Sequence, residues 1–167
     1  MLAAGGLPWA PGAAPGSGEH AGIEAGITAA APGTCVKLLD LRLAVIHGLS
    51  VDFSDPWSFI WLDRDPRWQA ESFRKFMIAV IGRRLSVTET RAYRESLLRD
   101  RDSSLAWLRE WGHPLLVMRY DDVLRDPLRE AGRLAEHLPW AALDVTAMAS
   151  VVHHRSPRTL PDLNVEL

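Results

Sequence analysis

Residues 57–77 read WSFIWLDRDPRWQAESFRKFM, and this stretch decides the fold that the sequence predicts. Its first seven residues, 57–63, are mostly apolar and predict a buried strand. Asp65 and Pro66 follow as a helix N-cap and as a proline whose backbone suits the first helical position, so a helix is expected from residue 66 to about residue 84. The stretch therefore predicts a strand that runs directly into a helix, with Arg64 at the junction and Ser72 two turns later.

The rest of the chain continues this alternation of strands and helices. Residues 1–34 are rich in Ala, Gly and Pro and predict an irregular segment, with a short Ala-rich helix over 20–31. Further strands are expected over 35–39 and 114–119, and helices over 41–49, 88–111 (one or two helices), 127–138 and 145–152. We therefore expect a single domain over 1–167 of the α/β class, an open parallel sheet with flanking helices.

Composition gives no indication of several classes of partner and favours one compartment. The chain has 167 residues and a formal net charge of −2, so no global charge points to nucleic acid or to an anionic membrane. No apolar run approaches the roughly 18 to 20 residues that cross a bilayer. Cys35 is the single cysteine, which rules out an intramolecular disulfide. These features favour a cytoplasmic protein that binds neither membranes nor nucleic acids.

Arg64 and Ser72 are the candidate site residues. In open parallel sheets, ligands bind beyond the carboxyl ends of the strands, where Arg64 falls. A guanidinium beside a helix N-terminus can hold a phosphate, and the Ser72 hydroxyl could donate a hydrogen bond to the same anion. In the alternative, Arg64 pairs with Asp63 or Asp65, and Ser72 bonds to a backbone carbonyl one turn back. The adjacent histidines His153 and His154 do not form a convincing metal site, so no metal is expected.

The order of these motifs resembles sulfotransferases that use 3′-phosphoadenosine 5′-phosphosulfate (PAPS). The strand, Arg64-Asp65-Pro66 and Ser72 are similar to the element that grips the 3′-phosphate of the nucleotide in that family. The residues that follow strand 114–119 look like the family's Tyr-Glu-Asp-Leu-type turn and the helix after it, and read RYDDVLRDP (119–127). The resemblance covers roughly residues 37–138. It implies a P-loop NTPase-like fold, PAPS or adenosine 3′,5′-bisphosphate as cofactor, and binding of its 3′-phosphate by Arg64 and Ser72.

The chain departs from this family at its N-terminus. The family opens with a strand and a Gly-, Ser- and Thr-rich loop that cradles the 5′-phosphosulfate, and residues 15–18 (PGSG) match it only superficially. We expect an N-terminally truncated form of the fold. Either Met1 is an internal methionine of a longer protein, or the chain is a remnant that lost this half of the site. A missing first strand would also favour a homo-oligomer.

Three functions are compatible with these observations. In the first, a full-length form transfers sulfonate from PAPS to a hydroxyl of a small-molecule or glycan acceptor, while this chain retains the 3′-phosphate half-site and has little activity. In the second, an inactive relative serves as a binding or interaction module. In the third, the chain belongs to another P-loop enzyme, such as a small-molecule kinase. No residue stands out as a catalytic base, so the catalytic group is unknown and enzymatic activity is left open.

Overall fold

The computed structural model describes residues 1–10, 32–35, 57–153, 159–160 and 165–166. Its centre is a pair of parallel strands, β1 (Phe59–Asp63) and β2 (Leu115–Arg119), in which Phe59 is opposite Leu115 and Asp63 is opposite Arg119. The chain between them forms two helices, α3 (Pro66–Ile81) and α4 (Val87–Glu110). Parallel strands need such a long crossover because a tight turn cannot bring the second strand back in the same direction. The described chain is thus of mixed α/β structure and is mostly helical.

Local capping fixes both helices of the crossover. The Asp65 side chain accepts a hydrogen bond from the Arg67 N–H at 2.7 Å, which starts α3. Gly82 ends this helix in a left-handed conformation, with φ of 71°, that glycine adopts without a Cβ penalty. Ser86 and Glu89 then form a reciprocal capping box that starts α4. The predicted helix 66–84 is therefore confirmed, but it ends three residues early because Gly82 reverses the chain.

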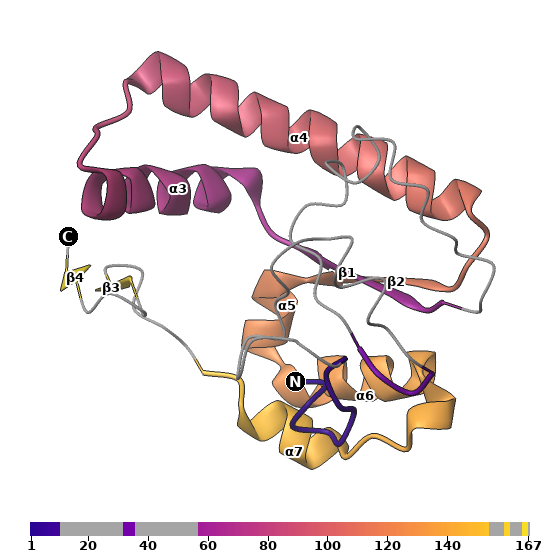
Figure 1. Ribbon diagram of the computed structural model, residues 1–167. Coiled ribbons are helices and arrows are strands. Elements are labelled where there is room, and N and C mark those ends of the chain that lie inside the picture. The colour runs from indigo at the N-terminus through magenta and orange to yellow at the C-terminus, as the bar shows by residue number, and fades with distance from the viewer. Residues whose placement is uncertain (11–31, 36–56, 154–158, 161–164, 167) are drawn as a thin grey trace.

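After β2 the described residues form three helices and a 3₁₀ turn. These elements are α5 (Tyr120–Arg125), α6 (Pro127–His137), the 3₁₀ turn η1 (Pro139–Ala141) and α7 (Val145–Ser150). Figure 1 shows α6 and α7 on one side of the strand pair and α4 on the other. The predicted helices over 127–138 and 145–152 are confirmed, and 88–111 is one helix. The turn expected after residue 119 is instead the short helix α5.

The hydrophobic core lies between β2 and the helices α5 to α7. Its buried members come from four elements and are Met118, Val123, Ala131, Leu134 and Met148. Ile60 and Leu116 pack against this cluster, as do Met1 and Leu2 of the N-terminal segment. In β2, the alternate residues Leu116 and Met118 thus face the core, whereas in β1 Ile60 does so and Leu62 is 53% exposed.

The N-terminal segment is attached to this core by its backbone. Asp144 donates its N–H to the Gly5 carbonyl at 3.0 Å, and Trp9 and Cys35 form an isolated parallel bridge. Of the predicted strand 35–39, only Cys35 is described. The predicted helices over 20–31 and 41–49 lie outside the described residues.

The expected sheet is only partly observed. Among the described residues, the parallel sheet has two strands, and the polar tail forms a separate antiparallel pair, β3 (Thr159–Leu160) and β4 (Val165–Glu166), that the sequence did not predict. In the described part of the chain, no helix has the length and apolar character needed to cross a membrane.

Candidate functional site

A cleft of about 620 Å³ opens at the carboxyl ends of β1 and β2. Its walls are the β1–α3 junction, one face of α4 and the end of β2. Ten residues line it: Asp63, Arg64, Asp65, Pro66, Arg67, Arg94, Leu98, Arg101, Arg119 and Asp121. Five of these are arginines and three are aspartates, so the cleft has an excess of positive charge in a chain whose net charge is −2.

One arginine of the cleft is neutralised by an ion pair. Arg101 binds both carboxylate oxygens of Asp63, with Nε 2.7 Å from Oδ1 and Nη2 2.8 Å from Oδ2. This fork-on-fork geometry connects the middle of α4 to the last residue of β1. The Asp63 side chain is 16% exposed and the Arg101 side chain 36% exposed, so the pair is partly shielded from water and joins α4 to the end of β1 as one wall of the cleft.

The other four arginines have no carboxylate partner among the residues that the structure describes. These are Arg64, Arg67, Arg94 and Arg119, and no ion pair joins any of them to a described side chain. Asp65 caps α3 through the Arg67 N–H and therefore contributes its carboxylate to the helix start. The guanidinium groups are the hydrogen-bond donors through which this cleft could bind an anion.

Arg64 is held over an aromatic ring. Its guanidinium carbon lies 5.0 Å from the centroid of the Tyr120 ring, a cation–π contact between the β1–α3 junction and the first residue of α5. This contact leaves the guanidinium N–H groups available for a ligand. The alternative in which Arg64 pairs with Asp63 is not observed, since Asp63 is occupied by Arg101.

Ser72 lies two turns into α3 and is half-buried. It is not one of the residues that line the cleft, so the structure does not bring it into the same hollow as Arg64. Within the described part of the chain, no hydrogen bond of its hydroxyl is observed, including the one to a backbone carbonyl that the alternative interpretation requires. Arg64 is thus the predicted site residue that the cleft contains.

Sequence reasoning did not single out Arg67, Arg94 or Arg101. Arg94 and Arg101 are seven residues apart, two helical turns, and share the face of α4 that carries Leu98 between them. This spacing could have shown that they lie on one face, but the identity of the partner across that face depends on the tertiary structure. In the described residues, no group of three His, Cys, Asp or Glu side chains is arranged to hold a metal ion.

No protein-family model, no curated protein and no solved structure matches this chain. The functional interpretation therefore depends on the geometry and charge of the cleft.

Proposed function

We propose that the cleft binds the 3′-phosphate of PAPS or of adenosine 3′,5′-bisphosphate, and that the protein is a sulfotransferase-like protein with a P-loop NTPase-like fold. The observation that carries this proposal is the position of Arg64. It follows directly on the carboxyl end of β1, lines the cleft, and has a ring contact but no carboxylate partner in the described residues. Arg119, at the same edge of the sheet, supplies a second cation.

The α3 N-terminus adds to this environment. Its backbone N–H groups and dipole favour a negative charge near Pro66 and Arg67, which line the same cleft. A phosphate monoester has three acceptor oxygens, which guanidinium donors from two elements can share. We propose Ser72 as a further donor to the same phosphate, although its place outside the cleft lining makes Arg64 the residue on which the proposal depends.

The proposed reaction is transfer of a sulfonate group from PAPS to a hydroxyl acceptor. It requires a full-length form of the protein that also binds the 5′-phosphosulfate. Within residues 57–153, the two segments in which a helix follows a strand contain no glycine. The basic cleft supports the proposed binding of the nucleotide 3′-end, whereas these two segments supply no glycine-rich backbone cradle for the sulfonate. We therefore assign this chain nucleotide binding, with little or no transfer.

Calorimetric titration with adenosine 3′,5′-bisphosphate tests the proposal. Arg64→Gln should weaken binding by about 10- to 150-fold, since a charge-assisted hydrogen bond contributes about 1.5–3 kcal/mol. Ser72→Ala should weaken it by a smaller factor. The control is Arg99→Gln, at an exposed arginine of α4 outside the cleft lining, which should bind as the wild type does.

Titration with a second nucleotide distinguishes the contribution of the 3′-phosphate to binding from that of the rest of the ligand. Adenosine 5′-monophosphate lacks this group, so Arg64→Gln should leave its weak binding unchanged. Absence of binding to the bisphosphate at millimolar concentration in a folded sample would refute the proposal, as would equal affinities of wild type and Arg64→Gln.

A binding or interaction module is the second candidate function. Helix α3 exposes large apolar side chains in its first turn and over its last turns, and these are Trp68 (55%), Phe76 (43%), Val80 (46%) and Ile81 (57%). Sedimentation of the wild type and of Trp68→Ala tests this candidate for self-association. A concentration-dependent dimer that the substitution weakens would support it, and a monomer for both proteins at every concentration would count against a homo-oligomer.

A further inference from the structure

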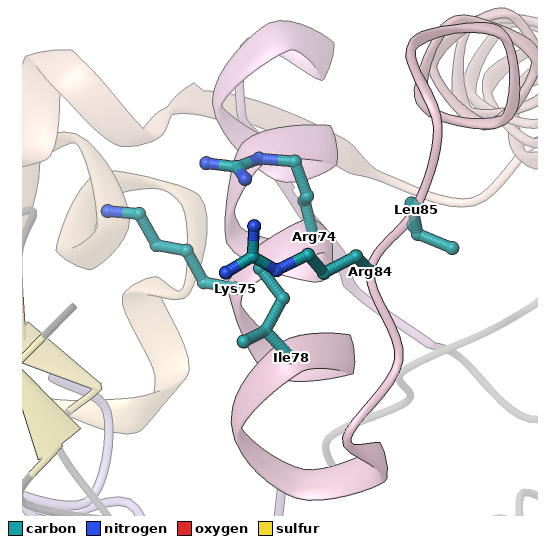
Figure 2. A pocket seen from close by; sticks show the side chains of 5 residues that line it. All are labelled: Arg74, Lys75, Ile78, Arg84 and Leu85. Atoms are coloured by element: carbon teal, nitrogen blue, oxygen red, sulfur yellow. The ribbon is translucent and has the colours of Figure 1, made fainter.

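A second basic hollow, of about 490 Å³, lies at the opposite end of α3 from the cleft. It is lined by Arg74, Lys75 and Ile78 of α3 and by Arg84 and Leu85 of the connection to α4. Figure 2 shows the three charged side chains extending to the same side of α3, with Ile78 below them. Arg74 is seven residues beyond Arg67, or about 10 Å along the helix, so this hollow is separate from the nucleotide cleft.

The turn at Gly82 creates this hollow. Its left-handed φ of 71° reverses the chain at the end of α3, and the Arg83 N–H bonds back to the Met77 carbonyl at 3.0 Å. Arg84 and Leu85 are thereby brought alongside the last turns of the helix that they have just left. A Cβ atom at position 82 would meet no atom of a non-neighbouring described residue within 4 Å. Glycine is therefore favoured here by the backbone conformation and not by a close neighbour.

The charges around this turn are unequally compensated. Arg83 forms an ion pair with Glu89, whereas Arg84 has no carboxylate partner among the described residues. Arg74 is bound by Glu71 through Nε at 3.0 Å and Nη2 at 2.6 Å, which orients its guanidinium and leaves the Nη1 donors available. Glu71 is the carboxylate paired with Arg74, and the Arg74 hydrogen bond, with a smaller contribution from Lys75, lowers the pKa of Glu71.

We propose that this hollow binds an oxyanion, a sulfate or phosphate monoester, attached to an apolar or aromatic body. Arg84 and the Nη1 group of Arg74 supply donors to the oxyanion, the Lys75 side chain adds positive charge to the lining, and Ile78 and Leu85 form the apolar floor against which the body packs. The site does not depend on the nucleotide cleft, because the two hollows have no lining residue in common.

Phenyl phosphate is the probe, with inorganic phosphate at the same ionic strength as the comparison. We expect phenyl phosphate to shift the Nε–Hε signals of Arg74 and Arg84 in ¹H–¹⁵N spectra. Arg84→Gln should weaken its binding at least fivefold, whereas Arg64→Gln in the cleft should not change it. Inorganic phosphate should bind several-fold more weakly, since it makes no contact with the apolar floor.

Gly82→Ala provides an independent test of the geometry. Alanine is strained at positive φ, so the turn should shift, displace Arg84 and weaken phenyl phosphate binding, while unchanged ¹H–¹⁵N signals of residues away from the turn report a folded protein. Signal changes confined to the cleft arginines, or wild-type affinity in Arg84→Gln, would overturn the proposed site. Equal affinities for phenyl phosphate and inorganic phosphate would refute the proposed contact between the apolar part of the ligand and the floor of the hollow.

Discussion

Replacing Arg101 by glutamine should destabilise the protein by about 2 kcal/mol. Arg101 donates to both oxygens of Asp63, at 2.7 and 2.8 Å, across 38 residues of sequence. Loss of one partner from a fully buried pair costs about 3–5 kcal/mol, because the other charge is left without compensation. Here Arg101 is 36% exposed and Asp63 is 16% exposed, so water can replace part of the lost contact. The expected cost is therefore about 2 kcal/mol, below the range for a fully buried pair.

Urea unfolding followed by tryptophan fluorescence measures this change. For a chain of this size, 2 kcal/mol corresponds to a fall in Tm of about 4–8 °C. The control is Arg91→Gln, which removes a surface ion pair with Glu95 whose side chains are 72% and 46% exposed. This control should cost about 0.5 kcal/mol or less.

A double-mutant cycle assigns the cost to the pair. In an Asp63→Asn background the carboxylate charge is absent, so adding Arg101→Gln should cost far less than it does in the wild type. The reasoning is refuted if Arg101→Gln is as mild as Arg91→Gln, or if its cost is the same in both backgrounds. The first result would mean that solvent screens the pair completely, and the second that Arg101 acts through contacts other than Asp63.

Three further predictions concern other parts of the chain. Burial raises the pKa of Cys35 from 9.0 to about 11, so iodoacetamide at pH 8 should modify the native thiol about 100-fold more slowly than the denatured one. By the same shift, stability should be fully present below pH 9 and should fall as pH rises toward 11, a decrease that Cys35→Ser removes. Met148→Ala should cost about 2–5 kcal/mol in urea unfolding because Met148 is 0% exposed, whereas Leu128→Ala, at a side chain 57% exposed, should cost under about 1 kcal/mol. The purified 167-residue chain should show no robust PAPS-dependent sulfonate transfer to a phenolic acceptor, and sustained turnover would contradict the inactivity proposed for it.

The sequence predicted those elements whose signals are local. Asp65 and Pro66 mark the start of α3, and the predicted strand at 57–63 and helix at 127–138 agree with β1 and α6 to within two residues. Caps and apolar periodicity act over about four residues, so they can be recognised without knowledge of the fold. The same locality placed Arg64 correctly at the carboxyl end of β1.

Errors occurred where a local signal was overlooked or a distant contact decided the outcome. Gly82 was not used as a helix stop, so the expected α3 was three residues too long. The segment after Arg119 reads as a polar turn, yet it forms α5, which buries Val123 in the core with Met148. The cluster that buries Val123 includes Met148, which lies 25 residues further along the chain, and no local pattern contains that information.

By itself the sequence determined a strand that ends at a basic residue beside a capped helix. Only the tertiary structure decided what that residue faces. Pairing of β1 with β2 puts Asp63 opposite Arg119, and the α3–α4 crossover returns Arg94 and Arg101 to the same cleft. The physical reason is the range of the interactions: helix caps join residues two to four positions apart, whereas the cleft depends on contacts that span about 30 to 60 residues and form only when the whole crossover folds.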